Sequence, residues 1–324
     1  MKIVELLQCP QCRVGTFSAQ EDFWQCEACH RFFPIYQGAP LLQKEASELQ
    51  TPTPSVVPRS SKFSSPPQRS FFSSLYGLAA HTPFVPFFSE LFFTRKGLSK
   101  LLQHAKGTVL EIGCGDQAQK KQLPLTCEYI PTDYVGWGEA LLGGSIQKNI
   151  FLPAWQPAPL VWADAASLPF RDGTIDTWMA IETLEHVPVL DQVLQEAGRV
   201  LKPDGICLIS IPWMYLVHGG HDDVGDYARY TKNAMTVYAK RAGLSLEEEF
   251  CNTSLLQTLV TAVNQYIVRL IFDNIRSSLI QGVCGFLVAP IFFVSNVLAL
   301  IFRGANRRFA TRYFFILRKP VSIS

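Results

Sequence analysis

Neither sign of charge dominates this chain of 324 residues. The 29 lysine and arginine residues nearly balance the 27 acidic ones, and the formal net charge is +2. Such a balance gives no overall attraction to nucleic acid, so we expect no nucleic-acid partner. A secretory signal is also missing, because residues 1–7 are too short and too charged for its apolar core. We therefore expect a cytoplasmic location, where the nine cysteines would stay reduced.

Two common phosphate-binding signatures are absent from a glycine turn at residues 109–116, which read VLEIGCGD. No Gly-Lys-Ser/Thr follows, which excludes the P-loop, and Ala118 occupies the place of the last glycine in the dinucleotide fingerprint. A nicotinamide cofactor is therefore disfavoured. The run predicts a buried strand that ends in an acid, Glu111, and a tight turn. Without Cβ atoms at Gly113 and Gly115, a ligand could come close to the backbone.

Further short strands follow at regular spacing, which predicts a doubly wound α/β fold. The second strand ends in an acid about 20 residues after the turn, where such a sheet places a carboxylate on a ribose diol. A third strand ends in Asp164, a fourth leads to Glu182, and a helix precedes the fifth. These predicted elements are strands at 127–134, 160–163, 170–181 and 206–211, and a helix at 190–201.

The combined motifs resemble the class I S-adenosylmethionine (SAM)-dependent methyltransferases. They are Glu-x-Gly-x-Gly, Ala-Asp-Ala…Leu-Pro-Phe, Leu-Glu-His-Val and Arg-Val-Leu-Lys-Pro-Asp-Gly. The resemblance covers residues 101–246 and a last strand at 313–317. It implies a Rossmann-like sheet of seven strands, preceded by helices such as the one we expect at 84–104. This sequence departs from the family at Gln117, near which a third glycine is common.

The resemblance also implies a SAM site. Glu111 and the turn would face the methionine head, Asp133 the ribose hydroxyls, and Asp164 with the Ala165 amide the adenine. Helix capping is the alternative role for Asp133 and for Asp164. The residues predicted to bind the cofactor are Glu111, Gly113, Cys114, Gly115, Asp133, Asp164, Ala165 and Glu182.

Three histidines are candidates for a catalytic base. His186 belongs to the Leu-Glu-His-Val motif, and a purely structural role is its alternative. His218 and His221 follow the fifth strand, where this fold accepts substrate; His221 and the two aspartates after it could instead form a metal site. Residues 226–231, DYARYT, resemble a recurring turn of the family, and their final threonine should cap a helix at 232–242.

Two Cys-x-x-Cys knuckles near the N-terminus predict a tetrahedral zinc site made by Cys9, Cys12, Cys26 and Cys29. His30 could replace its neighbour, and a disulfide or redox pair is the alternative. The stretch 6–42 resembles a small zinc-ribbon family whose free-standing members bind and activate methyltransferases. Four protein ligands leave no open position, so the metal would be structural. The ribbon itself could bind a substrate or partner, or only support the fold.

A charge-free stretch at residues 277–302 follows an apolar stripe at helical spacing in residues 255–271. Its length suits a membrane span, but a single span would separate the last strand from its sheet. We favour an in-plane or re-entrant helical pair, with the basic tail near anionic head groups. Pro290, near the centre of the stretch, permits a break. A soluble core, a dimer interface and a true span are the alternatives. We expect five parts: a zinc ribbon (1–43), a flexible Ser/Pro-rich linker (44–74), a methyltransferase domain (75–253), an apolar helical insertion (254–304), and the last strand with the tail (305–324).

The leading hypothesis is a SAM-dependent methyltransferase at the inner face of a membrane. Its acceptor would be a small molecule, lipid-like or isoprenoid-like. An RNA methyltransferase that uses the ribbon to bind its substrate, and a non-catalytic SAM-binding scaffold, are the two other hypotheses. The sequence predicts neither the methylated atom nor the oligomeric state.

Overall fold

The computed structural model describes residues 3–44, 82–86, 88–134, 136–142, 145–151, 157–215, 225–275, 277–302 and 309–321. All of the predicted linker except Lys44 and part of the basic tail lie outside these residues. The candidate bases His218 and His221 lie outside them too.

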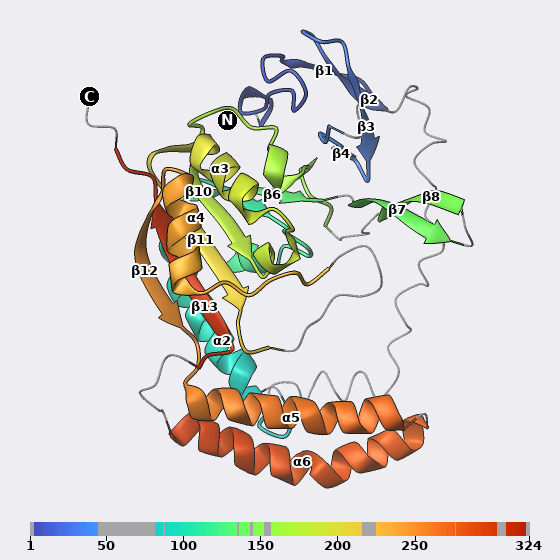
Figure 1. Cartoon of the computed structure of the whole chain (residues 1–324), viewed down its shortest axis with the longest axis vertical. Helices are drawn as coiled ribbons and strands as arrows, with labels where there is room; N and C mark the ends of the chain where they lie inside the picture. The colour runs from blue at the N-terminus through green and yellow to red at the C-terminus, as the bar shows by residue number, and fades with distance from the viewer. Residues whose placement is uncertain are drawn as a thin grey trace.

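A seven-stranded mixed sheet forms the centre of the protein (Figure 1), in the order β12-β13-β11-β10-β5-β6-β9. β13 is antiparallel to both of its neighbours, while β9, β6, β5, β10 and β11 are parallel. The predicted fold is therefore confirmed, including the last strand. The strands are β5 (Thr108–Ile112), β6 (Glu128–Asp133), β9 (Val161–Trp162), β10 (Ile175–Ile181), β11 (Leu201–Pro212), β12 (Ser245–Cys251) and β13 (Arg312–Arg318). A separate hairpin pairs β7 (Gly136–Leu142) with β8 (Ser145–Phe151).

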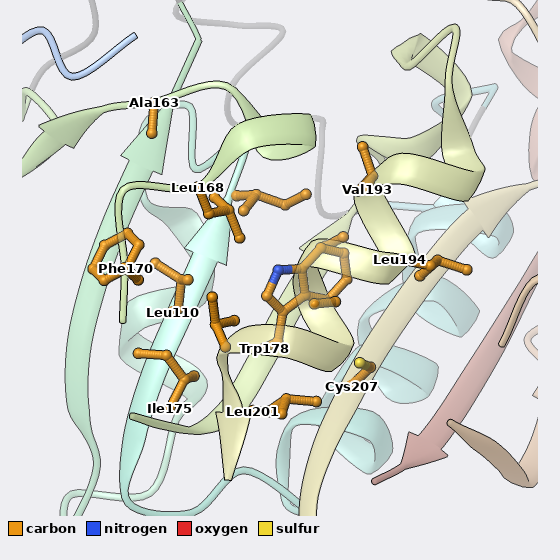
Figure 2. Close-up of a cluster of buried hydrophobic side chains, with 14 of the residues drawn as sticks. Leu110, Ala163, Leu168, Phe170, Ile175, Trp178, Val193, Leu194, Leu201 and Cys207 are labelled. Atoms are coloured by element: carbon orange, nitrogen blue, oxygen red, sulfur yellow. The ribbon is translucent and has the colours of Figure 1, made fainter. Parts of the chain in front are cut away.

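Helices pack on both faces of this sheet, which explains why β5 is buried along its whole length. α3 turns one face inward, because its buried residues recur three and four apart. Trp178 of β10 lies at the centre of the core (Figure 2). The helices on the sheet are α2 (Phe88–Leu102), α3 (Leu190–Val200) and α4 (Lys232–Arg241), with short 3₁₀ turns η3 (Ala118–Gln122), η4 (Ala165–Ser167) and η5 (Leu184–His186).

Two boundaries differ from the sequence prediction. β11 begins at Leu201 instead of residue 206, because its pairing with β10 resumes after a bulge at residues 202–205. The predicted fourth strand at 170–181 begins only at Ile175. Thr231 caps α4 as expected, since its side chain accepts a hydrogen bond from the Ala234 amide.

A small antiparallel sheet at the N-terminus packs on the edge of the large one. Leu41 pairs with Trp162 of the edge strand β9, and the Leu42 amide donates to the Trp162 carbonyl at 2.9 Å. The Gln8 amide donates to the carbonyl of Pro169 at 3.0 Å. This domain thereby covers a strand edge that would otherwise be open to pairing. Its elements are η1 (Ile3–Glu5), β1 (Phe17–Ala19), β2 (Phe23–Cys26), β3 (Phe32–Tyr36) and β4 (Ala39–Pro40).

An antiparallel helical hairpin connects β12 to β13 and lies at the opposite end of the molecule from the small sheet (Figure 1). It consists of α5 (Leu255–Asn274), which starts with a capping box at Ser254, and α6 (Ser278–Ile301), capped by Ser277. The break that Pro290 would permit is absent, because α6 continues through this residue. Both ends of the hairpin enter one sheet, so α6 cannot be the single crossing of a membrane.

Candidate active site and metal centre

The carboxyl ends of β5, β6 and β9 bring the predicted cofactor acids to one edge of the sheet. Glu111 of β5 is 2% exposed, and the Tyr129 hydroxyl of β6 donates to its carboxylate. Burial raises the pKa of Glu111 to about 8; the Tyr129 hydrogen bond opposes the shift, and the charges of Asp133 and Asp116 add to it. A cationic ligand beside this buried carboxyl group would favour its ionised form and would itself be stabilised.

The glycine turn after β5 has the open backbone that a ligand needs. Gly113 and Gly115 have φ values of 60° and 50°, in the left-handed region that favours glycine. A Cβ atom at Gly113 would come within 2.5 Å of Thr183, whereas one at Gly115 would meet nothing within 4 Å. The Gly115 amide donates to Asp133 Oδ2 at 2.8 Å. The turn and this acid therefore form one unit with free space beside it, and Cys114 packs beneath at 5% exposure.

Asp164 follows the edge strand β9, and Ala165 begins the 3₁₀ turn η4. Asp164 Oδ1 accepts a hydrogen bond from the Ala166 amide at 2.8 Å, so its capping role is present in the ligand-free chain. A cap and an adenine contact are compatible, because a carboxylate has two oxygens and about four acceptor sites. The roles of Asp133, Asp164 and Ala165 toward a cofactor stay predictions.

Glu182, at the end of β10, has an unusual backbone and two close partners. Its φ of 52° is left-handed for a residue with a side chain. Ser210 donates to Oε1 at 2.6 Å, and Arg312 Nε donates to Oε2 at 2.7 Å. Sequence reasoning did not single out Arg312, which lies 130 residues away in the chain.

His186 lies beside a buried acid that sequence reasoning did not single out. His186 Nδ1 is 2.8 Å from the Gly225 carbonyl oxygen, which can only accept, so Nδ1 carries the hydrogen. The neutral ring then has its basic lone pair on Nε2, 3.8 Å from Glu185 Oε1. Glu185 is fully buried, and within the described residues neither of its carboxylate oxygens accepts a hydrogen bond from another residue. Its pKa rises to about 7 through burial and through the negative charge of Asp226, against its own backbone hydrogen bond and Arg229.

The four predicted metal ligands come together in the small N-terminal sheet. The Sγ atoms of Cys9, Cys12, Cys26 and Cys29 all lie within 4.8 Å of one another, and no disulfide joins them. The Cys9–Cys29 and Cys12–Cys26 sulfur pairs are 3.7 and 3.6 Å apart. A tetrahedron with Zn–S bonds of about 2.3 Å has edges of about 3.8 Å, so the donor set fits Zn²⁺.

The lack of a side chain at Gly15 makes room for the Cys26 thiol in this cluster. A Cβ atom there would come within 2.2 Å of Cys26 Sγ, and the Gly15 carbonyl accepts from the Cys9 amide at 3.2 Å. His30 is not among the clustered ligands within the described residues. Of the alternatives for this motif, four clustered thiols favour the metal.

The N-terminal domain with the four cysteines (residues 3–44), called the metal-site domain below, also contacts the loop that carries Asp164. Arg13 Nη1 donates to the Leu168 carbonyl at 3.2 Å and pairs with Glu196 of α3 at 3.1 Å, while Nη2 donates to Ser167 at 3.3 Å. Cys9, Cys26 and Phe33 belong to the same hydrophobic cluster as Trp178. The two domains therefore share one core.

Residues 110–209 match the family model described as "Methyltransferase domain". The chain is 48% identical over 96 residues to the sterol 4-C-methyltransferase strm-1 of Caenorhabditis elegans, which is 30% of this chain and 28% of that protein. It is 42% identical over 74 residues to the ubiquinone/menaquinone biosynthesis C-methyltransferase UbiE of Bartonella tribocorum, 21% of this chain and 27% of that protein. A solved complex that contains the Haloferax volcanii Trm112 methyltransferase activator has a TM-score of 0.42 at 13% identity, covering 77% of this chain and 97% of that one.

The sheet order, the glycine turn and the family match together define a class I SAM-dependent methyltransferase domain. A four-cysteine cluster in a small antiparallel sheet accompanies it. The chain spans just over a quarter of the length of these two curated relatives.

Proposed function

We propose that this protein transfers a methyl group from SAM to a lipid-like acceptor at a membrane face. The observation that carries the acceptor class is the reversed polarity of the hairpin α5–α6. Its buried face contains Asn264 and Asn296, both 0% exposed, whereas its outer face is apolar. A helix on the surface of a soluble protein has the opposite arrangement.

The outer face of α6 is continuous over the length of the helix. Exposed apolar side chains recur every three or four residues, and Phe286 is 80% exposed. Leu279–Ile301 is long and apolar enough to cross a membrane, with only 17% of its most apolar window buried. Length and composition alone are weak evidence, so the proposal rests on the polarity of the two faces. The outward residues are Leu279, Val283, Phe286, Leu287, Val294, Leu298 and Ile301.

The edge of the sheet at the carboxyl ends of β10 and β11, called the substrate edge below, points toward this hairpin. In Figure 1 the arrowheads of β10 and β11 are directed at α5 and α6. Tyr215, just after β11, forms a side-chain hydrogen bond with Gln265 of α5. An acceptor dissolved in the bilayer would therefore meet the end of the sheet where the cofactor acids lie. The names of the relatives, a sterol and a quinone-pathway methyltransferase, agree with this acceptor class.

In the proposed reaction SAM supplies an activated methyl group, and this chain supplies position and proton handling. Glu111 and the Gly113–Gly115 backbone would hold the cationic end of the cofactor, and Asp133 its ribose. His186, whose neutral ring has its basic lone pair on Nε2, would accept a proton when the acceptor loses one. Alignment of the acceptor would supply much of the rate. The zinc would hold the N-terminal domain in shape and take no part in the chemistry.

The test combines membrane retention with methyl transfer. The full chain and a Phe286→Glu/Leu287→Glu variant would be expressed, and their membranes washed with high salt and then with alkaline carbonate. Leu125→Glu/Val237→Glu is the matched control, because these exposed apolar residues lie away from the hairpin. We expect the full chain and the control in the washed pellet, and the α6 variant in the supernatant.

The purified full chain would then be incubated with methyl-labelled SAM and a lipid extract of the same cells. Label that partitions into organic solvent supports a lipid acceptor. A full chain that is wholly soluble and forms dimers would instead make α6 a subunit interface. Label transferred only to a ribonuclease-sensitive or water-soluble fraction would contradict the acceptor class.

A further inference from the structure

A hollow of about 820 Å³ lies on the outer side of α2, beside η3. One end of its lining is apolar and aromatic, the other is cationic, and none of the described residues that line it is acidic. η3 contributes its last residue, Gln122, to the lining. Its lining residues are Phe88, Leu91, Phe92, Arg95, Lys96, Ser99 and Gln122.

The apolar end of this hollow is continuous with the hairpin. Phe84, just before α2, stacks on Phe293 of α6 with ring centroids 4.7 Å apart. Leu91 and Phe92, in the next turns of α2, are 41% and 44% exposed. Aromatic and aliphatic surface therefore extends from α6 onto the first two turns of α2.

Buried hydrogen bonds fix the position of α2 relative to α5 and α6. Asn296 Oδ1 accepts from the Ser89 amide at 3.2 Å, and its Nδ2 donates to the Val85 carbonyl at 2.8 Å. Asn264 of α5 donates to the Pro86 carbonyl at 2.8 Å. These contacts fix where the residues of α2 would lie relative to a bilayer that receives α6.

The cationic end lies one turn farther along α2. Arg95 and Lys96 are exposed, and neither forms an ion pair within the described residues. Seven residues of helix from Phe88 to Arg95 correspond to about 10 Å along the axis. Helices that lie in a membrane interface bury their apolar face by roughly 5–10 Å, with cations at the level of the head groups.

We propose that this α2 groove binds the phosphate-bearing head group of an anionic membrane lipid. The head group would pair with Arg95 and Lys96, and its acyl chains would lie against Leu91, Phe92 and the face of α6. This inference rests on the membrane location proposed above and adds its orientation: a bound lipid would hold the substrate edge toward the bilayer.

The test measures partitioning of the full chain onto vesicles of phosphatidylcholine alone, and of phosphatidylcholine and phosphatidylglycerol in equal parts. Each cation near an anionic surface contributes about 1 kcal/mol, so Arg95→Gln/Lys96→Gln should weaken binding to the anionic vesicles roughly twenty- to thirty-fold. Binding to the neutral vesicles should change little. Lys240→Gln/Arg241→Gln removes the same charge from α4 and should leave both unchanged. Leu91→Gln/Phe92→Gln should weaken binding to both kinds of vesicle.

Three outcomes would overturn the inference. Arg95→Gln/Lys96→Gln could bind anionic vesicles as the unmodified chain does, or the α4 control could lose as much. Excess inorganic phosphate could raise the melting temperature of the unmodified chain but not that of Arg95→Gln/Lys96→Gln, while the two proteins bind vesicles equally. The occupant of the groove would then be a free anion. A full chain that binds neither kind of vesicle would instead refute the membrane location itself, and the methyl-transfer assay reports separately on catalysis.

Discussion

Arg312 Nε donates a hydrogen bond to Glu182 Oε2 at 2.7 Å and so joins the first residue of β13 to the residue that follows β10. Arg312 Nη1 also donates to Thr94 of α2 at 3.0 Å and pairs with Glu90, whose side chain is 1% exposed. Burial lowers the pKa of Arg312 to about 10, which still leaves it charged at neutral pH. One guanidinium therefore connects α2, β10 and β13 at the edge that faces the hairpin.

Replacement of Arg312 by methionine should destabilise the protein strongly. It would leave Glu90 and Glu182 without their cation, and breaking a buried ion pair in this way costs about 3–5 kcal/mol. Arg318→Met, in the same strand, is the control, because its pairs with Glu247 and Asp204 are exposed and should matter far less. Urea midpoints of the two variants measure the difference. Equal midpoints would show that the Arg312 contacts contribute little.

Glu111 should make SAM binding depend on pH. Its pKa of about 8 in the ligand-free chain lies above the usual value, so the carboxyl group is mostly protonated at pH 6–7. A cationic ligand beside it favours the ionised form and must expel that proton. SAM affinity should therefore rise with pH, by up to about tenfold per unit, until it levels off near pH 8.

Glu111→Gln should weaken binding at pH 8 and remove most of this slope. Calorimetric titrations between pH 6 and 9 test both effects. Glu128→Gln is a suitable control, because Glu128 lies exposed at the opposite end of β6. A variant at Glu111 that keeps the slope of the unmodified chain would assign the proton to another group.

Zinc removal should weaken SAM binding although the cysteines lie in another domain. The metal-site domain contacts residues 167–170, next to Asp164, through Arg13 and through main-chain hydrogen bonds. Arg13→Met should reproduce part of the effect and cost about 1–2 kcal/mol of stability, since it leaves the Leu168 carbonyl and Glu196 with fewer partners. The zinc content by metal analysis, and the SAM dissociation constant before and after chelation, give the coupling.

Arg171→Met provides the control for Arg13. It removes a charge at the same boundary between the two domains. Within the described residues, Arg171 contacts the N-terminal domain only through its main chain, where its amide donates to the Leu6 carbonyl. An apo-protein that binds SAM as tightly as the zinc-loaded chain would show that the two sites are independent.

The sequence predicted the parts of this molecule whose signals are local. The turn at Gly113 and Gly115, the four cysteines and the helix cap at Thr231 each have a short signature. The last strand could be predicted 60 residues beyond the rest of the sheet because its aromatic and aliphatic run is unbroken. Pro290 permits a break but does not determine one, and α6 continues through it.

Contacts between distant segments could not be predicted. The pairing of Leu41 with Trp162 uses main-chain atoms. Because every residue has these atoms, no side chain in the sequence indicates the pairing. The ion pairs of Arg312 could not be predicted, because its carboxylate partners are Glu90 of α2 and Glu182, which follows β10. Glu185 belongs to the Leu-Glu-His-Val motif, but only the fold reveals that its carboxylate is buried and, within the described residues, accepts no hydrogen bond from another residue.

His186 and Glu185 should act together in proton transfer. If His186 Nε2 accepts the proton of the acceptor, His186→Gln should lower kcat by about a hundredfold or more, with little change in SAM affinity. The ionised form of Glu185 would stabilise the imidazolium. Because the pKa of Glu185 is raised to about 7, the ionised form becomes the major one as the pH rises above 7.

The pH profile of kcat should therefore rise through pH 7, and Glu185→Gln should lower kcat and remove that inflection. His104→Gln, at the exposed end of α2, controls for loss of an imidazole. A His186 variant with normal kcat but a lower melting temperature would make the residue structural, as its hydrogen bond to Gly225 alone would allow.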